Sequence, residues 1–231
     1  MSKTIGILGG VSYLSTILYY RYLNEQYSAK FGAAHSCPMQ IRSIDYHEIK
    51  SRYTQESGWN EISGLLRNEI ELLMLARPGC LIIANNTLHK AFDQISKEMN
   101  LSIPVLHAVQ MAKEKAQRSS FKKVLMLGTR FTMEDNYFKE PLTAAGIEVI
   151  VPDLGERLEI GKIHTELLNG GASAAHLQFF LSMTRKYDHM DAIILACTEL
   201  PLIFDRLDAQ LPVIDTMKLQ CDGALQLIGK N

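Results

Sequence analysis

One short apolar run ends in a residue type that can exchange protons with carbon. Ile193-Ile-Leu-Ala196 is followed directly by Cys197, Thr198 and Glu199. A thiol suits such chemistry because its free pKa, about 8.5, keeps both thiol and thiolate accessible near neutral pH. Two thiols on opposite faces of a carbon acid could invert its centre, one removing the Cα proton and the other delivering a proton.

A second apolar run ends in a similar way. Leu81-Ile-Ile-Ala-Asn-Asn matches Ile194-Leu-Ala-Cys-Thr, and this alignment sets Ala84 opposite Cys197. Other segments repeat in the same order: Lys3–Gly10 with Lys123–Arg130, Lys90-Ala-Phe-Asp with Leu202-Ile-Phe-Asp, and Ile103–His107 with Leu211–Asp215. The sequence therefore predicts two similar halves, with Ala84 at the place where a second thiol is expected.

The apolar runs are continuous rather than alternating, which is typical of parallel strands covered on both faces. The predicted strands are Thr4–Leu8, Cys80–Ile83, Val124–Leu127, Val149–Val151 and Ala192–Ala196. Helical spacing of apolar residues separates them, most clearly over Glu61–Ala76. We expect an α/β fold of two pseudo-symmetric lobes, each a parallel sheet flanked by helices, with the active site in the interlobe cleft at the carboxyl ends of strands. The predicted lobes are residues 1–117 with 218–231, and residues 118–217.

The composition excludes several classes of partner. Of 231 residues, 47% are hydrophobic and 21% charged, and the net charge is −1, so the chain carries no electrostatic signature of binding to nucleic acid or to an anionic membrane. No apolar run approaches the roughly 20 residues of a membrane span, and no signal-peptide core is expected. The cysteines lie far apart, without the spacing of metal ligands: Cys37, Cys80, Cys197 and Cys221. We expect free thiols in a soluble, cytoplasmic protein without a metal or cofactor.

Five segments, in order through nearly the whole chain, carry a resemblance to a known family. They are Thr4–Ser12, Ser43–Ile49, Asn86–Lys90, Leu127–Glu134 and Ala196–Glu199. These segments resemble the aspartate/glutamate racemase family. The resemblance implies two pseudo-symmetric α/β lobes, cofactor independence, a frequent homodimer, and Cα proton transfer on a small amino acid by one cysteine from each lobe. It implies that Cys197 is an acid/base, that Thr198 contacts the substrate carboxylate, and that Glu199 tunes or receives the proton of the thiol.

The chain departs from this family at the first cysteine. In the alignment above Ala84 takes its place, and a methyl group cannot exchange protons. Three explanations are open: a thiol removed by engineering, a natural one-thiol enzyme of the kind found among related decarboxylases, or a protein that has kept ligand binding without turnover. We therefore expect a racemase that is impaired or one-sided. The alternatives are a one-thiol decarboxylase or cis–trans isomerase of a small dicarboxylate, and a non-catalytic small-acid-binding protein. A cysteine at position 84 is expected to switch inversion on.

The remaining candidate contacts lie at junctions between strands and helices, where amides and hydroxyl groups can stabilise an enolate-like carboxylate. They are Gly10, Ser12, Asn85, Asn86, Thr87, Thr129 and Thr198. A basic residue for a side-chain carboxylate is not clearly matched, and Arg52, Lys162 or His164 could serve.

Three further groups have competing interpretations. His89 and Lys90 are expected on the solvated face of a helix, with a supporting role in the site as the alternative for His89. Asp45, His47 and Glu48 suggest a metal site, but neighbours in an extended segment alternate sides, which argues against it. The aromatic run Tyr19–Tyr22, with Tyr27, is expected to serve the core and a dimer contact.

Overall fold

The computed structural model describes residues 4–53, 55 and 57–229. It divides into two compact units, one made of residues 1–108 and 217–231 and the other of residues 109–216. The helix that follows residue 107 thus belongs almost entirely to the second unit, whereas the predicted boundary left it in the first. In the described part of the chain, no helix is both long and apolar enough to cross a membrane.

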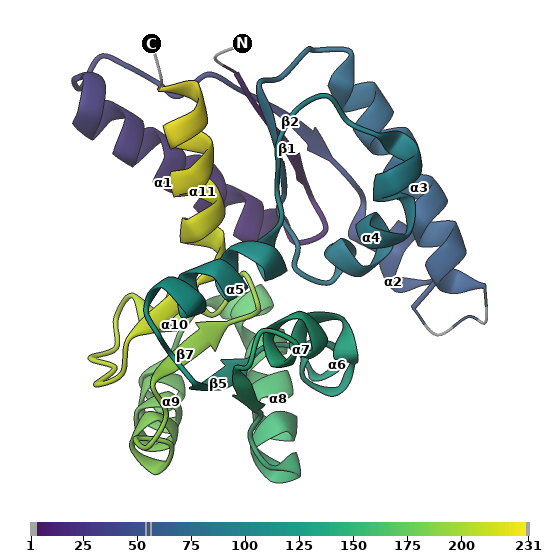
Figure 1. Cartoon of the computed structure of the whole chain (residues 1–231). Helices are drawn as coiled ribbons and strands as arrows, with labels where there is room; N and C mark the ends of the chain where they lie inside the picture. Colours follow the sequence, from purple (N-terminus) through teal and green to yellow (C-terminus); the bar gives the residue numbers. More distant parts are fainter. Residues whose placement is uncertain (1–3, 54, 56, 230–231) are drawn as a thin grey trace. The chain divides into compact units, whose positions relative to one another are not determined.

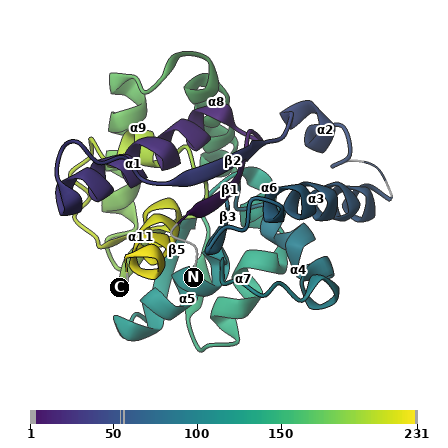
Figure 2. The ribbon, with the colours of Figure 1, turned by 90° about the horizontal axis from the view of Figure 1, so that it is seen from above.

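The first unit holds a four-stranded parallel sheet in the order β2-β1-β3-β4. Its strands are β1 (Ile5–Gly9), β2 (Met39–Ser43), β3 (Cys80–Ile83) and β4 (Val105–Leu106). Its helices are α1 (Tyr13–Phe31), α2 (Tyr46–Lys50), α3 (Gly58–Met74), α4 (Leu88–Met99) and α11 (Thr216–Ile228). Helices α1 and α11 lie on one face of this sheet and α3 and α4 on the other (Figures 1 and 2). Because β1 and β3 are covered on both faces, every residue in them is buried, as the continuous apolar runs predict.

The second unit repeats this topology, with a parallel sheet in the order β6-β5-β7-β8. Its strands are β5 (Lys123–Leu127), β6 (Glu148–Ile150), β7 (Ala192–Leu195) and β8 (Val213–Asp215). Its helices are α5 (Ala108–Arg118), α6 (Arg130–Glu134), α7 (Asn136–Thr143), α8 (Leu154–Gly170), α9 (Ala174–Lys186) and α10 (Pro201–Phe204). The shared strand order confirms the predicted α/β fold of two similar lobes.

The structure differs from the sequence-based description at two places. The strand β2 was not predicted, because its residues are mostly exposed and form no apolar run. The segment around Asp45, His47 and Glu48 is not extended. The Asp45 side chain accepts a hydrogen bond from the His47 amide at 3.0 Å and caps the short helix α2.

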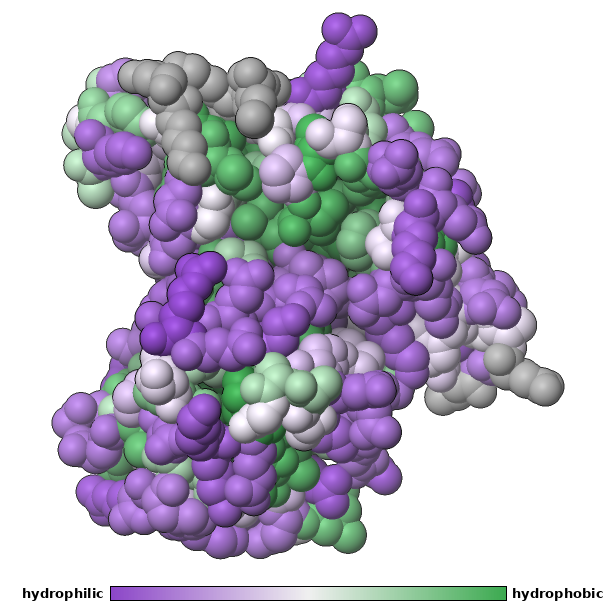
Figure 3. Space-filling view, in the orientation of Figure 1, coloured by the Kyte–Doolittle hydropathy of each residue, from purple (hydrophilic) through white to green (hydrophobic). Residues whose placement is uncertain are grey.

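The core of the first unit is clearest where α3 and α4 cover β3. Ile62, Leu66 and Ile70, which recur at helical spacing on α3, pack in one cluster with Leu81 and Ile83 of β3. In Figure 3 the residues of this unit seen between α11 and α4 are largely apolar, whereas the outward side of α3 and α4 is largely hydrophilic. This packing fixes the end of β3, from which the loop carrying Ala84 to Thr87 leaves the sheet.

Candidate active site

Cys197 lies two residues beyond the end of β7 and is only 5% exposed. Its Sγ donates a hydrogen bond to Oε2 of Glu199 at 3.0 Å. Burial raises the pKa of the Cys197 thiol well above its ordinary value, and the neighbouring charge and hydrogen bond of Glu199 raise it further. The resting thiol is therefore protonated, and its proton already points at a carboxylate that can accept it.

Glu199 connects the thiol to a third group. The same Oε2 accepts a hydrogen bond from Oγ1 of Thr198 at 3.2 Å and lies 3.4 Å from Nε2 of His164 in α8. Glu199 is 4% exposed, whereas the side chain of His164 retains 21% exposure. The three groups thus lie in a row that begins at a buried thiol, the proton donor, continues through the Glu199 carboxylate, and ends at an imidazole with access to solvent.

Two of the basic residues proposed to hold a side-chain carboxylate, Lys162 and His164, lie on the helix α8. Lys162 and His164 are two residues apart, so their side chains leave the helix about 200° apart and point in opposite directions. The ammonium group of Lys162 is 70% exposed and pairs with Glu159 at 2.9 Å, which raises its pKa. The structure therefore gives no support to Lys162 as a substrate contact, and His164 is the residue that α8 directs to Glu199.

Arg52 is also engaged elsewhere. Its guanidinium group pairs with Glu48 at 3.0 Å and with Glu61 at 3.3 Å, both within the first unit. These two carboxylates already neutralise the charge that a substrate carboxylate would need. The structure therefore gives no support to Arg52 as the group that holds a side-chain carboxylate.

The backbone register shows which residue of the first unit corresponds to Cys197. The amide of Ala84 donates to the carbonyl of Leu8 at 2.8 Å, and the amide of Ala196 donates to the carbonyl of Leu127 at 2.7 Å. Leu8 is paired with Ile83 in the first sheet as Leu127 is paired with Leu195 in the second. Ala84 thus corresponds to Ala196, and the next residue, Asn85, corresponds to Cys197.

Other hydrogen bonds agree with this register. The matched pairs are Gly79 N to Thr4 O with Asp191 N to Lys123 O, Leu81 N to Pro104 O with Ile193 N to Pro212 O, and Lys90 N to Thr87 O with Leu202 N to Glu199 O. In each matched pair, the distance along the chain between the two donor residues is one residue shorter than the distance between Ala84 and Cys197. The assignment of Ala84 to the missing cysteine was therefore wrong, because a slip of one residue moves every side chain to a different place.

The corrected register matches the two loops residue by residue. Asn85, Asn86 and Thr87 of the first unit correspond to Cys197, Thr198 and Glu199 of the second. Oδ1 of Asn85 accepts a hydrogen bond from the Leu88 amide at 3.0 Å, so this side chain pairs with the first amide of α4. Asn86 and Thr87 are buried. An amide thus stands in the first unit where the second unit has the Cys197 thiol, and an amide does not titrate near neutral pH.

The other predicted junction residues are chiefly structural in what they contact. Ser12 caps α1 by accepting from the Ser15 amide, and Thr129 caps α6 by accepting from the Thr132 amide, both at 3.3 Å. Gly10 has a φ of 89°, and a Cβ there would lie 2.3 Å from the carbonyl oxygen of Ile44. Only glycine fits this turn after β1, so Gly10 sets the path of the loop rather than offering a side chain.

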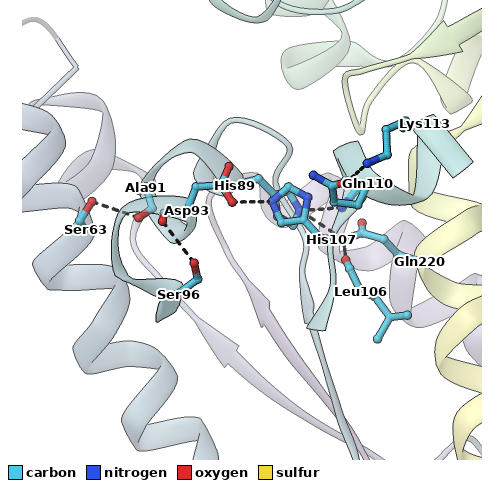
Figure 4. A network of polar contacts seen from close by, with 11 residues as sticks. Ser63, His89, Ala91, Asp93, Ser96, Leu106, His107, Gln110, Lys113 and Gln220 are labelled. Carbon is cyan, nitrogen blue, oxygen red and sulfur yellow. Dashed lines mark hydrogen bonds and ion pairs between the residues drawn. The ribbon is translucent and has the colours of Figure 1, made fainter. Parts of the chain in front are cut away.

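His89 is fully buried, so the expectation of a solvated face was wrong for this residue. Its Nε2 accepts from the Ala108 amide at 3.3 Å, and burial and the nearby His107 lower its pKa well below the usual value. Gln220 of α11, which the sequence did not single out, donates to the carbonyl of Leu106 at 2.7 Å and to that of Ile83 at 3.3 Å (Figure 4). The neutral imidazole and the amide thereby support the ends of β3 and β4.

Comparison with known proteins places this arrangement in a family. The model of the family described as Asp/Glu/Hydantoin racemase matches residues 8–224. The chain belongs to that family. It is 26% identical over 232 residues to a Bacillus subtilis (strain 168) protein named broad specificity amino-acid racemase RacX, and the match covers 92% of each chain.

Solved structures of the family have the same fold. A candidate Asp/Glu racemase from Yersinia pestis is 31% identical with a TM-score of 0.85, covering 99% of this chain and 100% of the other. An aspartate racemase homologue from Pyrococcus horikoshii OT3 is 28% identical with a TM-score of 0.83, at the same coverage. These similarities support the racemase fold over the whole length of the chain.

Proposed function

We propose that this chain is a proton-transfer enzyme of the aspartate/glutamate racemase type in which Cys197 is the working acid/base. The observation that carries the proposal is the hydrogen bond from the Cys197 thiol to Glu199, combined with an amide, Asn85, at the matching position of the first unit. The loop after β7 supplies a thiol and a carboxylate, whereas the matching loop after β3 supplies neither. The substrate is a small amino acid or a related dicarboxylate.

The proposed step conserves atoms and charge. Glu199 accepts the thiol proton, and His164 lies beside it to exchange that proton with solvent. The thiolate then removes the Cα proton, and the electron pair left on Cα delocalises into the substrate carboxylate as an enediolate. Hydrogen-bond donors at a strand end stabilise that charge. Return of a proton from the same sulfur regenerates the same enantiomer, so exchange occurs without inversion.

The proposal is tested by hydrogen isotope exchange. Each enantiomer of aspartate and of glutamate is incubated with the protein in deuterated water, and deuterium at Cα and optical purity are measured by mass spectrometry and chiral chromatography. We expect deuterium to enter one enantiomer of the substrate while its optical purity is retained. Cys197→Ser should abolish exchange. Glu199→Gln keeps the size of the side chain but removes the carboxylate that accepts the thiol proton, so it should slow exchange about 10²–10⁴-fold. Cys221→Ser, at a buried thiol of the first unit, is the matched control.

Other outcomes distinguish the competing functions. Fast racemisation would contradict a one-sided site and show that another group delivers protons to the second face. Turnover of malonate-like or maleate-like acids, with none of amino acids, would assign the chain to the one-thiol decarboxylases or isomerases. A rise in melting temperature with these ligands, without any exchange, would identify a binding protein, since ligands that bind only the native state stabilise it.

We also propose that the chain forms a homodimer through α1. Tyr13, Ile17 and Tyr20 recur on one side of this helix and are exposed, although Tyr19 is buried in the core. An exposed apolar stripe of this kind is typical of an interface. Light scattering should give twice the chain mass for the wild type and the chain mass for Ile17→Glu with Tyr20→Glu. The four free cysteines further favour a reducing, cytoplasmic location.

A further inference from the structure

The second unit brings three metal-ligating side chains together at the loop after β7. Nε2 of His164, Sγ of Cys197 and a carboxylate oxygen of Glu199 all lie within 4.8 Å of one another. The sulfur and the carboxylate oxygen are 3.0 Å apart, and the nitrogen and that oxygen are 3.4 Å apart. Cys197 and Glu199 are buried, and the imidazole of His164 reaches the surface.

This donor set and its spacing match a tetrahedral zinc centre. Zinc binds cysteine sulfur, histidine nitrogen and carboxylate oxygen at about 2.0–2.3 Å, so its ligands lie roughly 3.3–3.6 Å from one another. The three atoms need to move by only a few tenths of an ångström to about an ångström to reach those separations. Three protein ligands would leave the fourth position for water or for a carboxylate of a small acid.

We propose that His164, Cys197 and Glu199 form a binding site for a thiophilic divalent cation of the zinc type. Binding replaces the thiol proton: the S–H bond of Cys197 breaks, the proton leaves to solvent, and the sulfur binds the cation. Glu199 then ligates the cation instead of accepting the thiol hydrogen bond. Because a thiolate and an imidazole are soft and borderline ligands, Mg²⁺ and Ca²⁺, which prefer oxygen, are excluded.

The inference does not require turnover. If the chain does exchange Cα protons, Zn²⁺ should inhibit it by occupying the acid/base group, and a chelator should reverse the inhibition. If the chain has no proton-exchange activity, the cation should still bind. Failure of the proposed function and failure of the cation site are thus observed in different measurements.

The test is titration of the full chain with Co²⁺ and Zn²⁺ under reducing conditions. With Co²⁺ we expect a sulfur-to-cobalt charge-transfer band in the near ultraviolet that saturates at one equivalent, and Zn²⁺ should abolish the band by displacement. A 1:1 stoichiometry for Zn²⁺ should follow by calorimetry. Mg²⁺ and Ca²⁺ should give no heat.

Variants decide whether these three ligands hold the cation. Cys197→Ser should remove the charge-transfer band, and His164→Ala and Glu199→Gln should each weaken binding by more than about tenfold. The matched control is His176→Ala, because His176 pairs with Glu166 at 2.7 Å in the same unit without a thiol beside it. A band that survives Cys197→Ser, equal affinity in the His164→Ala variant, or the absence of stoichiometric binding would each overturn the proposal.

Discussion

A thiol placed at position 85, not at position 84, should give this protein the ability to invert an amino acid. The backbone register matches Cys197 to Asn85, so Asn85→Cys gives the two units a thiol at matching positions, whereas Ala84→Cys adds a sulfur one residue earlier, at a site with 1% exposure. We expect measurable inversion of aspartate or glutamate by the first variant. The second should behave like the parent chain.

The structure also predicts how the two variants differ in stability. Asn85→Cys removes the side-chain acceptor of the Leu88 amide, a hydrogen bond of 3.0 Å, which should cost about 1 kcal/mol in the free energy of unfolding. Ala84→Cys forces a sulfur into the packed end of β3, which should cost roughly 1–3 kcal/mol. Asn85→Ser is the matched control, because a serine hydroxyl can still accept a hydrogen bond from the Leu88 amide but cannot exchange protons with carbon.

Inversion is followed by polarimetry and chiral chromatography, and stability by urea unfolding. Folded Asn85→Cys protein without inversion, together with inversion by Ala84→Cys, would refute the register argument. Inversion by Asn85→Ser would refute the requirement for a thiol. A folded protein is required of each variant, and the unfolding curves establish it in the same set of measurements.

Three predictions concern the scaffold. Burial raises the pKa of the Cys37 thiol to about 11. Above about pH 8.5 the unfolded chain therefore loses this proton before the folded chain does, and the free energy of unfolding falls by about 1.4 kcal/mol per pH unit until the pH reaches the pKa of the folded protein. Urea unfolding of Cys37→Ala should show a smaller loss of stability over this alkaline range. Gln220→Leu removes the side-chain donor of two buried carbonyls, those of Ile83 and Leu106, and should cost about 3 kcal/mol by the same assay. Gly10→Ala, at a φ of 89°, should cost more than about 2 kcal/mol in thermal unfolding, whereas Gly64→Ala on the open surface of α3 should gain about 0.5–1 kcal/mol.

The sequence predicted the parts of the fold that rest on continuous apolar runs. The bounds predicted for the strands β1, β3, β5, β6 and β7 and for the helix α3 differ from the observed ones by at most three residues at either end. The strand β2 was not predicted because its mostly exposed residues show no hydrophobic pattern, although it pairs with β1 along five residues. Pairing with a neighbour, rather than burial of its own side chains, makes this segment a strand.

The site was only partly predictable. Cys197 and Glu199 were singled out because they follow an apolar run that the chain repeats and because they lie in a segment that resembles the family. Their neighbour His164 lies much earlier in the chain, and the choice between it and Lys162 depended on which way each side chain leaves α8. The alignment of Ala84 with Cys197 could have been recognised as one residue out of register from the sequence alone. Phe92-Asp93 and Phe204-Asp205, which follow the two loops, are already separated by one position fewer than Ala84 and Cys197 are.

The two loops match in their backbone hydrogen bonds, but their side chains differ in chemistry. The loop of the first unit has side chains that do not titrate near neutral pH: Asn85, Asn86 and Thr87. The matching loop of the second unit has the thiol of Cys197 and the carboxylate of Glu199, with His164 beside them. Substitution of one residue therefore does not make the halves equal. A cysteine at position 85 would find Thr87 where Cys197 finds Glu199, and so would lack an adjacent acceptor for its proton. Inversion by that variant should consequently be slower than isotope exchange at the face that Cys197 serves, and the ratio of the two rates measures what the carboxylate contributes.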